Sequence, residues 1–317
     1  MLQPMQVYRD LSAIGKIPNA VVTIGTFDGV HGGHRKIIER IRLLAQEVGG
    51  ESVIVTFHPH PRHIITPDNP VYYLTTQEEK IAILDKLGVD NLVIIPFSRS
   101  FSEISAESYV EEFLLGTFHP KVIVFGYDHK FGKDRKGDIQ LLKQIAGARG
   151  VRIEEIAAHE IDAVTVSSSR IRKYLLQGNV EAANALLGYP YPLSGLVVKG
   201  DQIGRTLGFP TANIFEDDPD KLIPADGVYV VGVDVGKQKG LYGLLSIGHR
   251  PTFNKSEKRI EVYILDFNES VYGEKMHIRL LRFLREDKKF DSRESLIEAI
   301  REDEKNGRAF LSTIPHV

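Results

Sequence analysis

Ala20-Val21-Val22-Thr23-Ile24-Gly25-Thr26-Phe27-Asp28-Gly29-Val30-His31-Gly32-Gly33-His34 decides the fold of the first half of this 317-residue chain. The apolar run over 20–24 is typical of a buried parallel strand, and the apolar residues of 35–47 recur at helical spacing. Between them lies a turn in which Gly25 and three further glycines allow the backbone to bend sharply and approach a ligand. The stretch therefore predicts a strand, a turn and a helix, with a ligand site at the carboxyl end of the strand.

Two histidines stand in this turn, three positions apart. If the helix begins near Gly32, His31 and His34 project from one face of its first turn. A helix N-terminus offers unpaired N–H groups to phosphates, and neighbouring imidazoles can stabilise an oxyanion at phosphorus. We therefore predict a phosphate-binding turn rather than a plain connection with solvated histidines.

The composition is that of an ordinary globular protein long enough for two domains. Hydrophobic residues make up 42% and charged residues 26% of the chain, and the net charge is −2. This charge gives no general attraction for nucleic acid or an anionic membrane. The absence of cysteine excludes disulfides and thiolate metal sites. No signal-like or membrane-spanning run is evident, so we expect a cytoplasmic protein.

Strands and helices alternate through the rest of the first half. This order predicts an α/β domain with a doubly wound parallel sheet. The expected strands cover 52–57, 91–96, 121–125 and 151–156, and the expected helices cover 76–87, 106–115 and 138–149.

Polar residues follow the expected strands, and parallel strands bring such ends together near His31 and His34. His58 and His60 follow the strand at 52–57, and Asp128 follows the strand at 121–125. The alternatives are an exposed proline-rich loop for the two histidines and an Asx turn for Asp128.

A short helix is expected from the serines at 167–169 to Gly178, because the serines can cap its start. Its N–H groups and hydroxyls, Ser168 among them, together with Arg170 and Arg172, suit the phosphates of a nucleoside triphosphate. A capped surface helix with scattered arginines is the alternative.

Four of these motifs occur in the order found in one known family. They are the His-x-Gly-His turn, Thr56-Phe57-His58-Pro59-His60-Pro61, the loop 126–132 and Ser-Ser-Ser-Arg-Ile-Arg at 167–172. The first half thus resembles the adenylyltransferase half of bifunctional riboflavin kinase/FMN adenylyltransferases, which are Rossmann-like nucleotidylyltransferases. The resemblance implies ATP binding by Gly25, Phe27, His31, His34, Ser168 and Arg170, and FMN binding by His58, His60 and Asp128.

The second half changes to a β pattern after an expected helix at 179–187. Gly188-Tyr189-Pro190-Tyr191-Pro192 is the predicted linker, which gives domains at 1–188 and 189–317. Short strands with turn signals and one late helix, at 292–305, predict a small antiparallel barrel with a carboxyl-terminal helix. The expected strands are 193–198, 227–233, 240–247, 259–266 and 276–284.

The segment 200–213 carries the chemistry of this half. Its glycines allow close backbone approach, Arg205 suits phosphate, and the Thr211 hydroxyl and Asn213 carbonyl are oxygen donors that Mg²⁺ accepts. It is not a Walker loop, because Gly-Lys-Ser/Thr is missing. A glycine-rich hairpin without function is the alternative.

This segment and three that follow resemble the riboflavin kinase module of the same family: 224–229, 247–253 and 261–267. The resemblance makes Glu261 the base for the ribityl hydroxyl of riboflavin, with Mg²⁺-ATP on Thr211 and Asn213. It assigns ATP and flavin binding to Gly204, Arg205, Gly208, Pro210, Thr211 and Asn213. Alternation places Glu261, Tyr263 and Leu265 on one face of their strand.

The two implied reactions differ in what they require. A hydroxyl nucleophile needs a base, whereas the phosphate of FMN is already ionised and needs only charge stabilisation as pyrophosphate leaves ATP. The implied catalytic residues are therefore Glu261 in one half and His31 and His34 in the other. The product is FAD, and the expected partners are ATP, riboflavin and FMN, with neither nucleic acid nor membrane, for a monomer or a weak homo-oligomer.

Three positions depart from the family pattern. His129 replaces an aromatic residue of the loop 126–132, which affects the expected flavin contact and the rate of adenylylation. Ser246 replaces an asparagine and is expected to affect packing alone. Ser169 replaces a threonine and keeps the hydroxyl.

Two other readings remain at this point. His31, His34, His58 and His60 could hold a metal for hydrolysis, although Asp28 is the only nearby carboxylate. A flavin-binding or nucleic-acid-binding regulator is the other reading. A carrier, however, would need neither the arginine helix nor Glu261.

Overall fold

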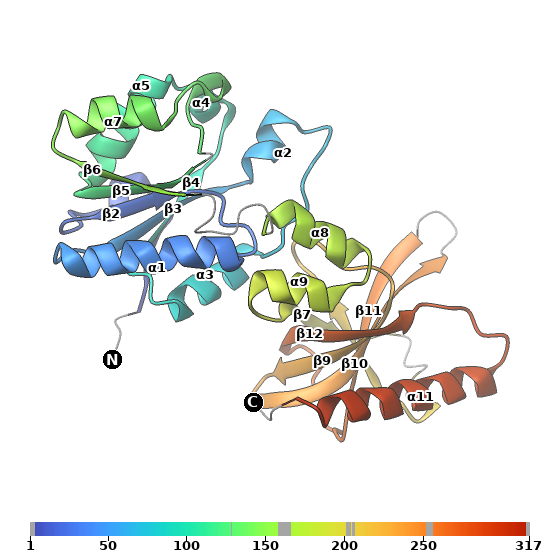
Figure 1. Ribbon diagram of the computed structural model, residues 1–317. Helices are drawn as coiled ribbons and strands as arrows, with labels where there is room; N and C mark the ends of the chain where they lie inside the picture. Colours follow the sequence, from blue (N-terminus) through green and yellow to red (C-terminus); the bar gives the residue numbers. More distant parts are fainter. Residues whose placement is uncertain are drawn as a thin grey trace. The chain divides into compact units, whose positions relative to one another are not determined.

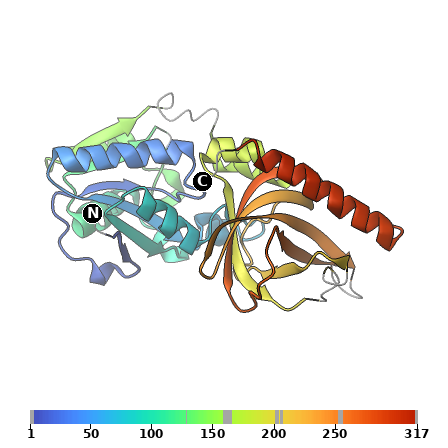
Figure 2. The same cartoon turned by 90° about the horizontal axis from the view of Figure 1, so that it is seen from below.

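The computed structural model describes residues 4–127, 129–157, 166–200, 204, 207–251 and 256–314. By their contacts these residues form two compact units, Met1–Ser168 and Ser169–Val317. The first is an α/β unit and the second is a barrel unit (Figures 1 and 2).

The first unit is built on a parallel sheet of six strands in the order β1-β4-β3-β2-β5-β6. The predicted doubly wound parallel sheet is confirmed. Its strands are β1 (Gln6–Tyr8), β2 (Val21–Ile24), β3 (Ser52–His58), β4 (Asn91–Pro96), β5 (Val122–Gly126) and β6 (Arg152–Ile156).

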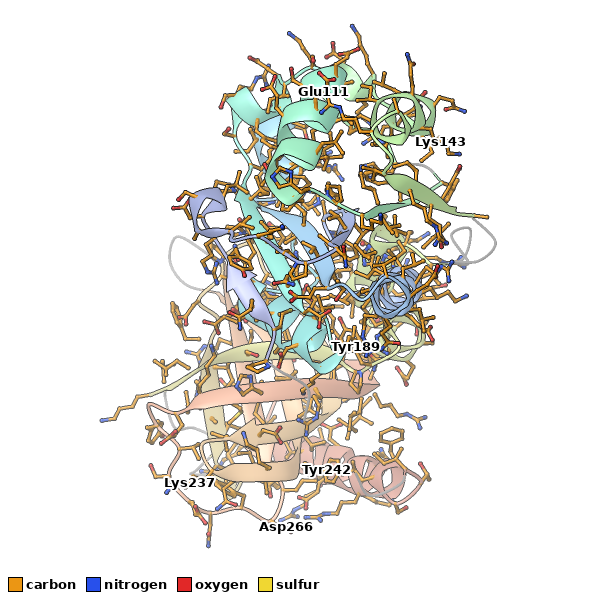
Figure 3. The ribbon with its side chains drawn as sticks, turned by 90° about the vertical axis from the view of Figure 1, so that its left-hand side faces the viewer. Glu111, Lys143, Tyr189, Lys237, Tyr242 and Asp266 are labelled. Carbon is orange, nitrogen blue, oxygen red and sulfur yellow. The ribbon has the colours of Figure 1, made fainter. Side chains whose placement is uncertain are left out.

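Helices cover both faces of this sheet (Figure 1). One face carries α1 (Gly32–Glu47) and α3 (Gln77–Lys86). The other carries α5 (Ala106–Ser108), η2 (Tyr109–Leu115), α6 (Gly116–Phe118) and α7 (Ile139–Gly147), and Figure 3 labels Glu111 of η2 and Lys143 of α7. Shorter helices are η1 (Leu11–Ala13), α2 (Pro61–Ile65), α4 (Arg99–Ser102) and η3 (Lys133–Arg135).

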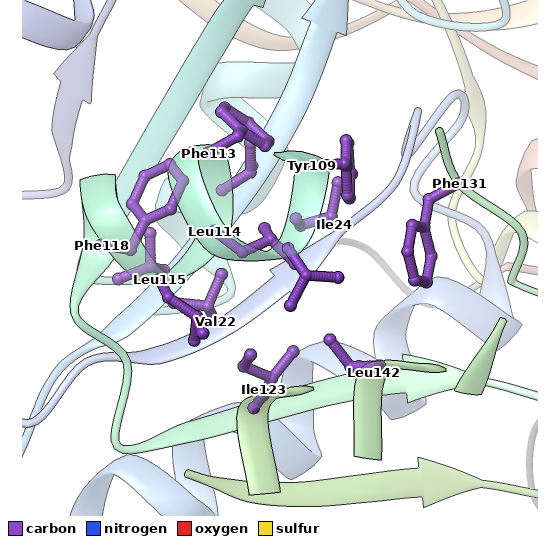
Figure 4. Close-up of a cluster of buried hydrophobic side chains, with 14 of the residues drawn as sticks. Val22, Ile24, Tyr109, Phe113, Leu114, Leu115, Phe118, Ile123, Phe131 and Leu142 are labelled. Carbon is purple, nitrogen blue, oxygen red and sulfur yellow. The ribbon is translucent and has the colours of Figure 1, made fainter. Parts of the chain in front are cut away.

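Two hydrophobic cores explain why the central strands are apolar throughout. Val22 packs in one core and its neighbour Val21 in the other, since successive residues of a strand point to opposite faces. Figure 4 shows the first core, where Val22, Ile24 and Ile123 of the sheet meet side chains of η2, α6 and α7. Coverage on both faces is what a parallel sheet requires.

Several elements differ from those expected in the first unit. The edge strand β1 and the short helices α2 and α4 were not predicted, because three to five residues give too little periodicity to detect. The helix expected over 106–115 forms, but Tyr109–Leu115 is a π-helix.

The second unit is a closed antiparallel barrel in the order β10-β11-β8-β7-β12-β9. The predicted barrel is confirmed, with one strand more than expected, because β8 lies in the glycine-rich segment. Its strands are β7 (Tyr191–Val198), β8 (Thr211–Phe215), β9 (Gly227–Val235), β10 (Gln238–Pro251), β11 (Ser256–Ile264) and β12 (Lys275–Glu286).

Helix α11 (Arg293–Leu311) lies along the outer wall of the barrel (Figure 2). A Cβ atom on Gly307 would lie 2.9 Å from Cδ2 of Leu244, so glycine lets the helix approach β10 closely. The helix runs six residues beyond its predicted end at 305.

Two helices precede the barrel, α8 (Ser168–Leu176) and α9 (Val180–Leu187). The Asn184 amide of α9 donates to the Leu280 carbonyl at 2.8 Å, and the backbone N–H of Tyr191 donates to Asn184 Oδ1 at 2.7 Å. These bonds attach α9 to the barrel. The contact boundary falls after Ser168, the first residue of α8, and the predicted domain boundary at 188/189 stays a prediction.

The predicted linker is shorter than expected. Tyr191 and Pro192 belong to β7, and the Tyr191 ring is fully buried with its hydroxyl donating to the Leu222 carbonyl at 2.7 Å.

Among the helices of the described ranges, none has the length and hydropathy to cross a bilayer.

Gly50 tests how tightly the first unit is packed at the start of β3. A Cβ atom there would lie 2.2 Å from the Asn19 carbonyl oxygen. This oxygen belongs to the backbone and cannot easily move away. We expect Gly50→Ala to lower the free energy of unfolding by about 2 kcal/mol. Urea unfolding of the full chain measures this value.

Gly147→Ala is the matched control, because no atom lies within 4 Å of the added carbon at the end of α7. It should be neutral or stabilising by up to about 1 kcal/mol. Equal losses in the two variants would contradict the steric explanation.

Candidate functional site

The turn after β2 has an unusual backbone. Phe27 (φ 45°) and Val30 (φ 37°) adopt the left-handed region that side chains disfavour, and Gly29 (φ 80°) lies between them. A β-branched residue in this region is a genuine outlier. Strain of this kind persists only where surrounding contacts enforce it, and it is concentrated at functional sites.

Side chains from other elements hold this turn. The Thr26 carbonyl accepts hydrogen bonds from Thr56 Oγ1 of β3 at 3.0 Å and from Lys80 Nζ of α3 at 2.8 Å. The Asp28 carbonyl accepts one from Ser168 Oγ, the first residue of α8, at 3.0 Å. Ser168 therefore contacts the histidine turn, and its role in ATP binding stays a prediction. Lys80 was missed, because nothing in the sequence distinguishes it from the other lysines of amphipathic helices.

The predicted start of the helix is confirmed. Helix α1 begins at Gly32, with His31 as its N-cap. The Nδ1 atom of His31 accepts the backbone N–H of His34 at 3.4 Å, so the ring proton of neutral His31 lies on Nε2. The two imidazoles stack with centroids 3.7 Å apart.

His34 is held neutral. Burial, followed by the neighbouring His31 and the Lys80 ammonium, holds the pKa of His34 well below its usual range. Burial likewise lowers the pKa of Lys80, partly opposed by Asp28. His34 thus acts near neutral pH as a hydrogen-bonding ring rather than as a cation. Its Nδ1 atom is buried without a hydrogen-bond partner within the described part of the chain.

Asp28 is committed to the protein backbone. It is buried, and its Oδ1 atom accepts the N–H groups of Leu74 at 2.9 Å and Thr75 at 3.3 Å. The described residues contain no group of three histidine or acidic side chains close enough to hold a metal ion.

The other predicted residues of this half have mixed placements. Phe27 is buried in the core beside His34, and a Cβ atom on Gly25 would lie 3.2 Å from the Phe27 ring, so Gly25 makes room for it. ATP binding by Gly25 and Phe27 stays a prediction. Arg170 lies in the second unit, where its Nε donates to Tyr174 Oη at 3.3 Å. Asp128 lies outside the described residues.

His58 and His60 lie at the end of β3, near Tyr73. The His60 N–H donates to Tyr73 Oη at 3.1 Å, and His60 Nδ1 accepts the Arg62 N–H at 3.1 Å as the cap of α2. The His58 ring is 6.1 Å from the Tyr73 ring. His60 therefore has a structural role, and FMN binding by these residues stays a prediction.

His129 fills an aromatic position. Its ring stacks on Phe125 with centroids 4.3 Å apart, and its Nε2 atom is buried without a partner among the described residues. Burial, assisted by Arg135, lowers the pKa of His129 to about 4. It therefore packs as a neutral ring, as the usual aromatic residue would.

The second unit holds a cavity of about 280 Å³ that contains the predicted base. Strand pairing places Glu261 opposite Asn213 and Tyr263 opposite Thr211, so all four side chains share one face. Thr211 Oγ1 donates to Glu261 Oε2 at 3.1 Å, and Arg259 Nη1 lies 3.4 Å from Glu261 Oε1. Leu265 was predicted to share this face, but β11 ends at Ile264, so Leu265 lies outside the strand.

The glycine-rich segment is built around these side chains. A Cβ atom on Gly204 would lie 2.3 Å from the Phe209 carbonyl oxygen, and one on Gly200 would lie 2.2 Å from Asn213 Nδ2. Gly208 adopts φ 89°, and Pro210 is exposed. Neither of these two lines the cavity. Arg205 lies outside the described residues.

The cavity has one polar and one apolar wall. The apolar wall comes from the glycine-rich segment, the barrel strands, the segment before α11 and α11 itself. Its residues are Leu207, Val228, Leu244, Phe290, Leu296 and Ile300. Residues of α11 were not predicted here, because their helical pattern indicates packing alone. Arg285 also lines the cavity, and its Nε and Nη2 atoms donate to Oδ1 and Oδ2 of buried Asp303 at 2.9 and 2.8 Å.

Ser246 requires a correction. We expected it to affect packing alone, but it pairs directly with Glu261 across β10 and β11 and lines the cavity. Strand register, which the sequence did not reveal, determines this placement.

His129 generates a pH prediction. Its pKa is about 4 in the fold and 6.5 ordinarily, so below pH 6.5 the unfolded chain binds a proton that the fold does not. Stability should therefore fall as the pH drops from 6.5 toward 4, by about 3 kcal/mol at most. Urea unfolding of the wild type and His129→Phe at about pH 7 and about pH 4.5 measures it. The variant should lose about 2 kcal/mol less, and equal losses would contradict the assignment.

Comparisons with known proteins agree with this two-site architecture. The family model for FAD synthetase matches residues 14–170, and that for riboflavin kinase matches residues 187–311. The chain is 38% identical over 298 residues to a bifunctional riboflavin kinase/FMN adenylyltransferase from Listeria monocytogenes, covering 93% of this chain and 94% of that protein. A relative of the same name from Escherichia coli K12 is 32% identical, covering 97% and 98%.

A solved structure shares the fold. It is named as a macrolide-efflux protein from Streptococcus pneumoniae, and it is similar with a TM-score of 0.85 and 32% identity over 96% of this chain and 99% of that one. The name describes that protein, and the likeness extends over both units. From the two family models and the full-length relatives, the chain belongs to the bifunctional riboflavin kinase/FMN adenylyltransferase family.

Proposed function

We propose that this chain makes FAD from riboflavin in two ATP-dependent steps, phosphorylating riboflavin in the second unit and adenylylating FMN in the first. The observation that carries the proposal is the Glu261–Thr211 hydrogen bond in the cavity, opposite Asn213 on the neighbouring strand. It brings together a base and two oxygen donors that the resemblance assigned separately. The relatives named above support the same pair of reactions.

Glu261 is the base of the first reaction. The carboxylate accepts the proton of the ribityl 5′-hydroxyl while that oxygen attacks the γ-phosphorus of ATP, and ADP leaves as FMN forms. The Thr211 hydroxyl and the Arg259 guanidinium orient the carboxylate and stabilise its charge. The apolar wall, with Leu296 and Ile300 of α11, suits the flat isoalloxazine ring.

The polar wall fits a magnesium ion. Mg²⁺ takes oxygen donors, which the Thr211 hydroxyl, the Asn213 amide and the Glu261 carboxylate all provide on one face of the barrel. Thr211 and Asn213 would hold the ion, and when bound it neutralises the charge of the ATP phosphates. Arg205, with Gly204, Gly208 and Pro210, is proposed to bind the nucleotide and the flavin beside them.

The histidine turn carries the second reaction. A phosphate oxygen of FMN attacks the α-phosphorus of ATP and pyrophosphate leaves, so no base is needed. The N–H groups at the start of α1 and the Nε2–H of His31 donate to the phosphate oxygens, with Ser168 and Arg170 assigned to the same nucleotide. His58, His60 and Asp128 are the proposed FMN contacts.

The proposal places the protein in the cytoplasm, where ATP is available.

One time course tests the whole proposal. Full-length protein is incubated with riboflavin, ATP and Mg²⁺, and the flavins are separated by chromatography. FMN should rise first and then give way to FAD. Recovery of unchanged riboflavin would overturn the proposed activity.

Substitutions should separate the two reactions. Glu261→Gln removes the base and should slow FMN formation by about 100-fold or more, while FAD formation from supplied FMN is unchanged. His31→Ala should slow FAD formation by about 100-fold and leave FMN formation intact. Rates are measured with each flavin supplied separately. Glu269→Gln, at an exposed carboxylate, is the control, and joint loss of both activities would contradict two independent sites.

Lys80 is predicted to be a positioning residue for the adenylyl transfer. Lys80→Met removes one donor to the Thr26 carbonyl and the cation near His34, so FAD formation should fall about 10-fold. The pKa of His34, measured by NMR titration, should rise in this variant. Lys86→Met, at an exposed position on the same helix, should change neither value. An unchanged His34 pKa in Lys80→Met would contradict the assignment.

A further inference from the structure

We propose that the first unit has a separate binding site for a small phosphate dianion at the amino-terminal edge of its sheet. The site is a cavity of about 170 Å³ lined by the segments that lead into β2 and β5. Its lining residues include Gly15, Lys16, Ile17 and Asn19 before β2, and His119 and Lys121 before β5.

The cavity lies at the opposite end of the strands from the histidine turn. The lining segments precede β2 and β5, whereas Gly25–His31 follows β2. The four residues of β2 span about 13 Å, so the two sites are at least that far apart. The cavity is therefore not part of the adenylyltransferase site.

Its charge is positive and unneutralised, because Lys16 and Lys121, with their ammonium groups, line it and its lining includes no aspartate or glutamate. His119 also lines it. Across the described ranges, none of these three side chains forms an ion pair or a hydrogen bond. Some basic side chains elsewhere on this unit do, as Arg152 does with Glu47 and Glu154. An anion at this cavity would meet cations that no carboxylate competes for.

The backbone supplies further donors. Gly15, Lys16 and Ile17 donate no hydrogen bond from their N–H groups to any described residue. These N–H groups are therefore not committed to the described part of the chain and can donate to an anion. The cavity wall is fixed, because the Asn19 amide donates to the Val48 carbonyl at 3.1 Å and the Gly49 carbonyl at 3.2 Å.

Both segments are also conformationally restrained. Asn19 (φ 41°) and His119 (φ 44°) adopt the left-handed region, and Pro18 and Pro120 stand next to them. Restrained, strained backbone is a feature of ligand sites, because it fixes donors in place before the ligand arrives.

The chemistry favours a phosphoryl group over other anions. Several basic side chains and a row of N–H groups match the many acceptor oxygens and the double charge of phosphate better than a single carboxylate. The volume is well below the 280 Å³ of the cavity in the second unit, so a single ion or a terminal phosphoryl group suits it better than a larger ligand. Such a group could come from free phosphate or from the end of a nucleotide.

Lysine footprinting on the full-length protein tests the site locally. Amine acylation is followed by peptide mass spectrometry, with and without inorganic phosphate, at ionic strength matched with chloride. Lys16 and Lys121 should react at least about threefold more slowly with phosphate. Lys237, labelled in Figure 3, and Lys239 serve as exposed references in the second unit and should not change.

Further arms identify the source and the specificity. Protection by phosphate alone indicates free phosphate, and protection also by adenosine monophosphate indicates a terminal phosphoryl group; both support the site. Acetate should not protect. Equal protection by acetate, or none by any phosphate compound, would overturn the proposal.

A double variant gives a second measurement. In the wild type, phosphate should shift the NMR signals of the backbone amides of Gly15–Ile17. Lys16→Gln with Lys121→Gln should abolish these phosphate-dependent shifts while both enzyme activities are retained. Lys237→Gln with Lys239→Gln removes the same charge elsewhere and should behave as wild type. Phosphate shifts that persist in the first variant would contradict the site. Because this readout is local, it stands or fails independently of the proposed activities.

Discussion

Hydrogen bonding of two backbone carbonyls, those of Thr26 and Asp28, is the constraint on which the first unit depends. The turn that carries these groups contains residues in the strained left-handed region of the backbone. Thr56, Lys80 and Ser168, from three separate elements, donate hydrogen bonds to the two carbonyls. A strand, a helix of the sheet layer and the start of α8 must all be in place before the turn has this shape. The histidines inherit their positions from this arrangement, because His31 caps the helix that the turn begins.

The two units meet the demands of phosphate chemistry in different ways. In the first, the proposed donors are backbone N–H groups and histidine side chains, positioned by a parallel sheet whose strands end at one edge. In the second, antiparallel pairing sets Glu261 against Asn213 and Ser246, so register rather than strand direction assembles the polar wall. The closed barrel keeps that register from slipping, because each strand is paired on both sides.

Much of this could be predicted from the sequence. Largely apolar runs, such as Val53–Val55 within β3, identify strands covered on both faces, and the placement of glycine and histidine predicts the phosphate turn. Short-range patterns could not reveal contacts between distant segments, such as Lys80 with Thr26 or Ser246 with Glu261. They also gave no sign that burial would leave His34 neutral or that β8 would form inside a glycine-rich segment.

The strand edges of the sheet have a consequence for how the protein behaves at high concentration. Its outermost strands are β1, with three residues, and β6, whose Arg152, Glu154 and Glu155 all engage in ion pairs. Short or charged edges resist the addition of a strand from a neighbouring molecule. The barrel has no free edge to offer, since its strands close on themselves. Both units therefore protect their apolar strands from self-association by strand pairing, the route by which β-rich chains commonly aggregate.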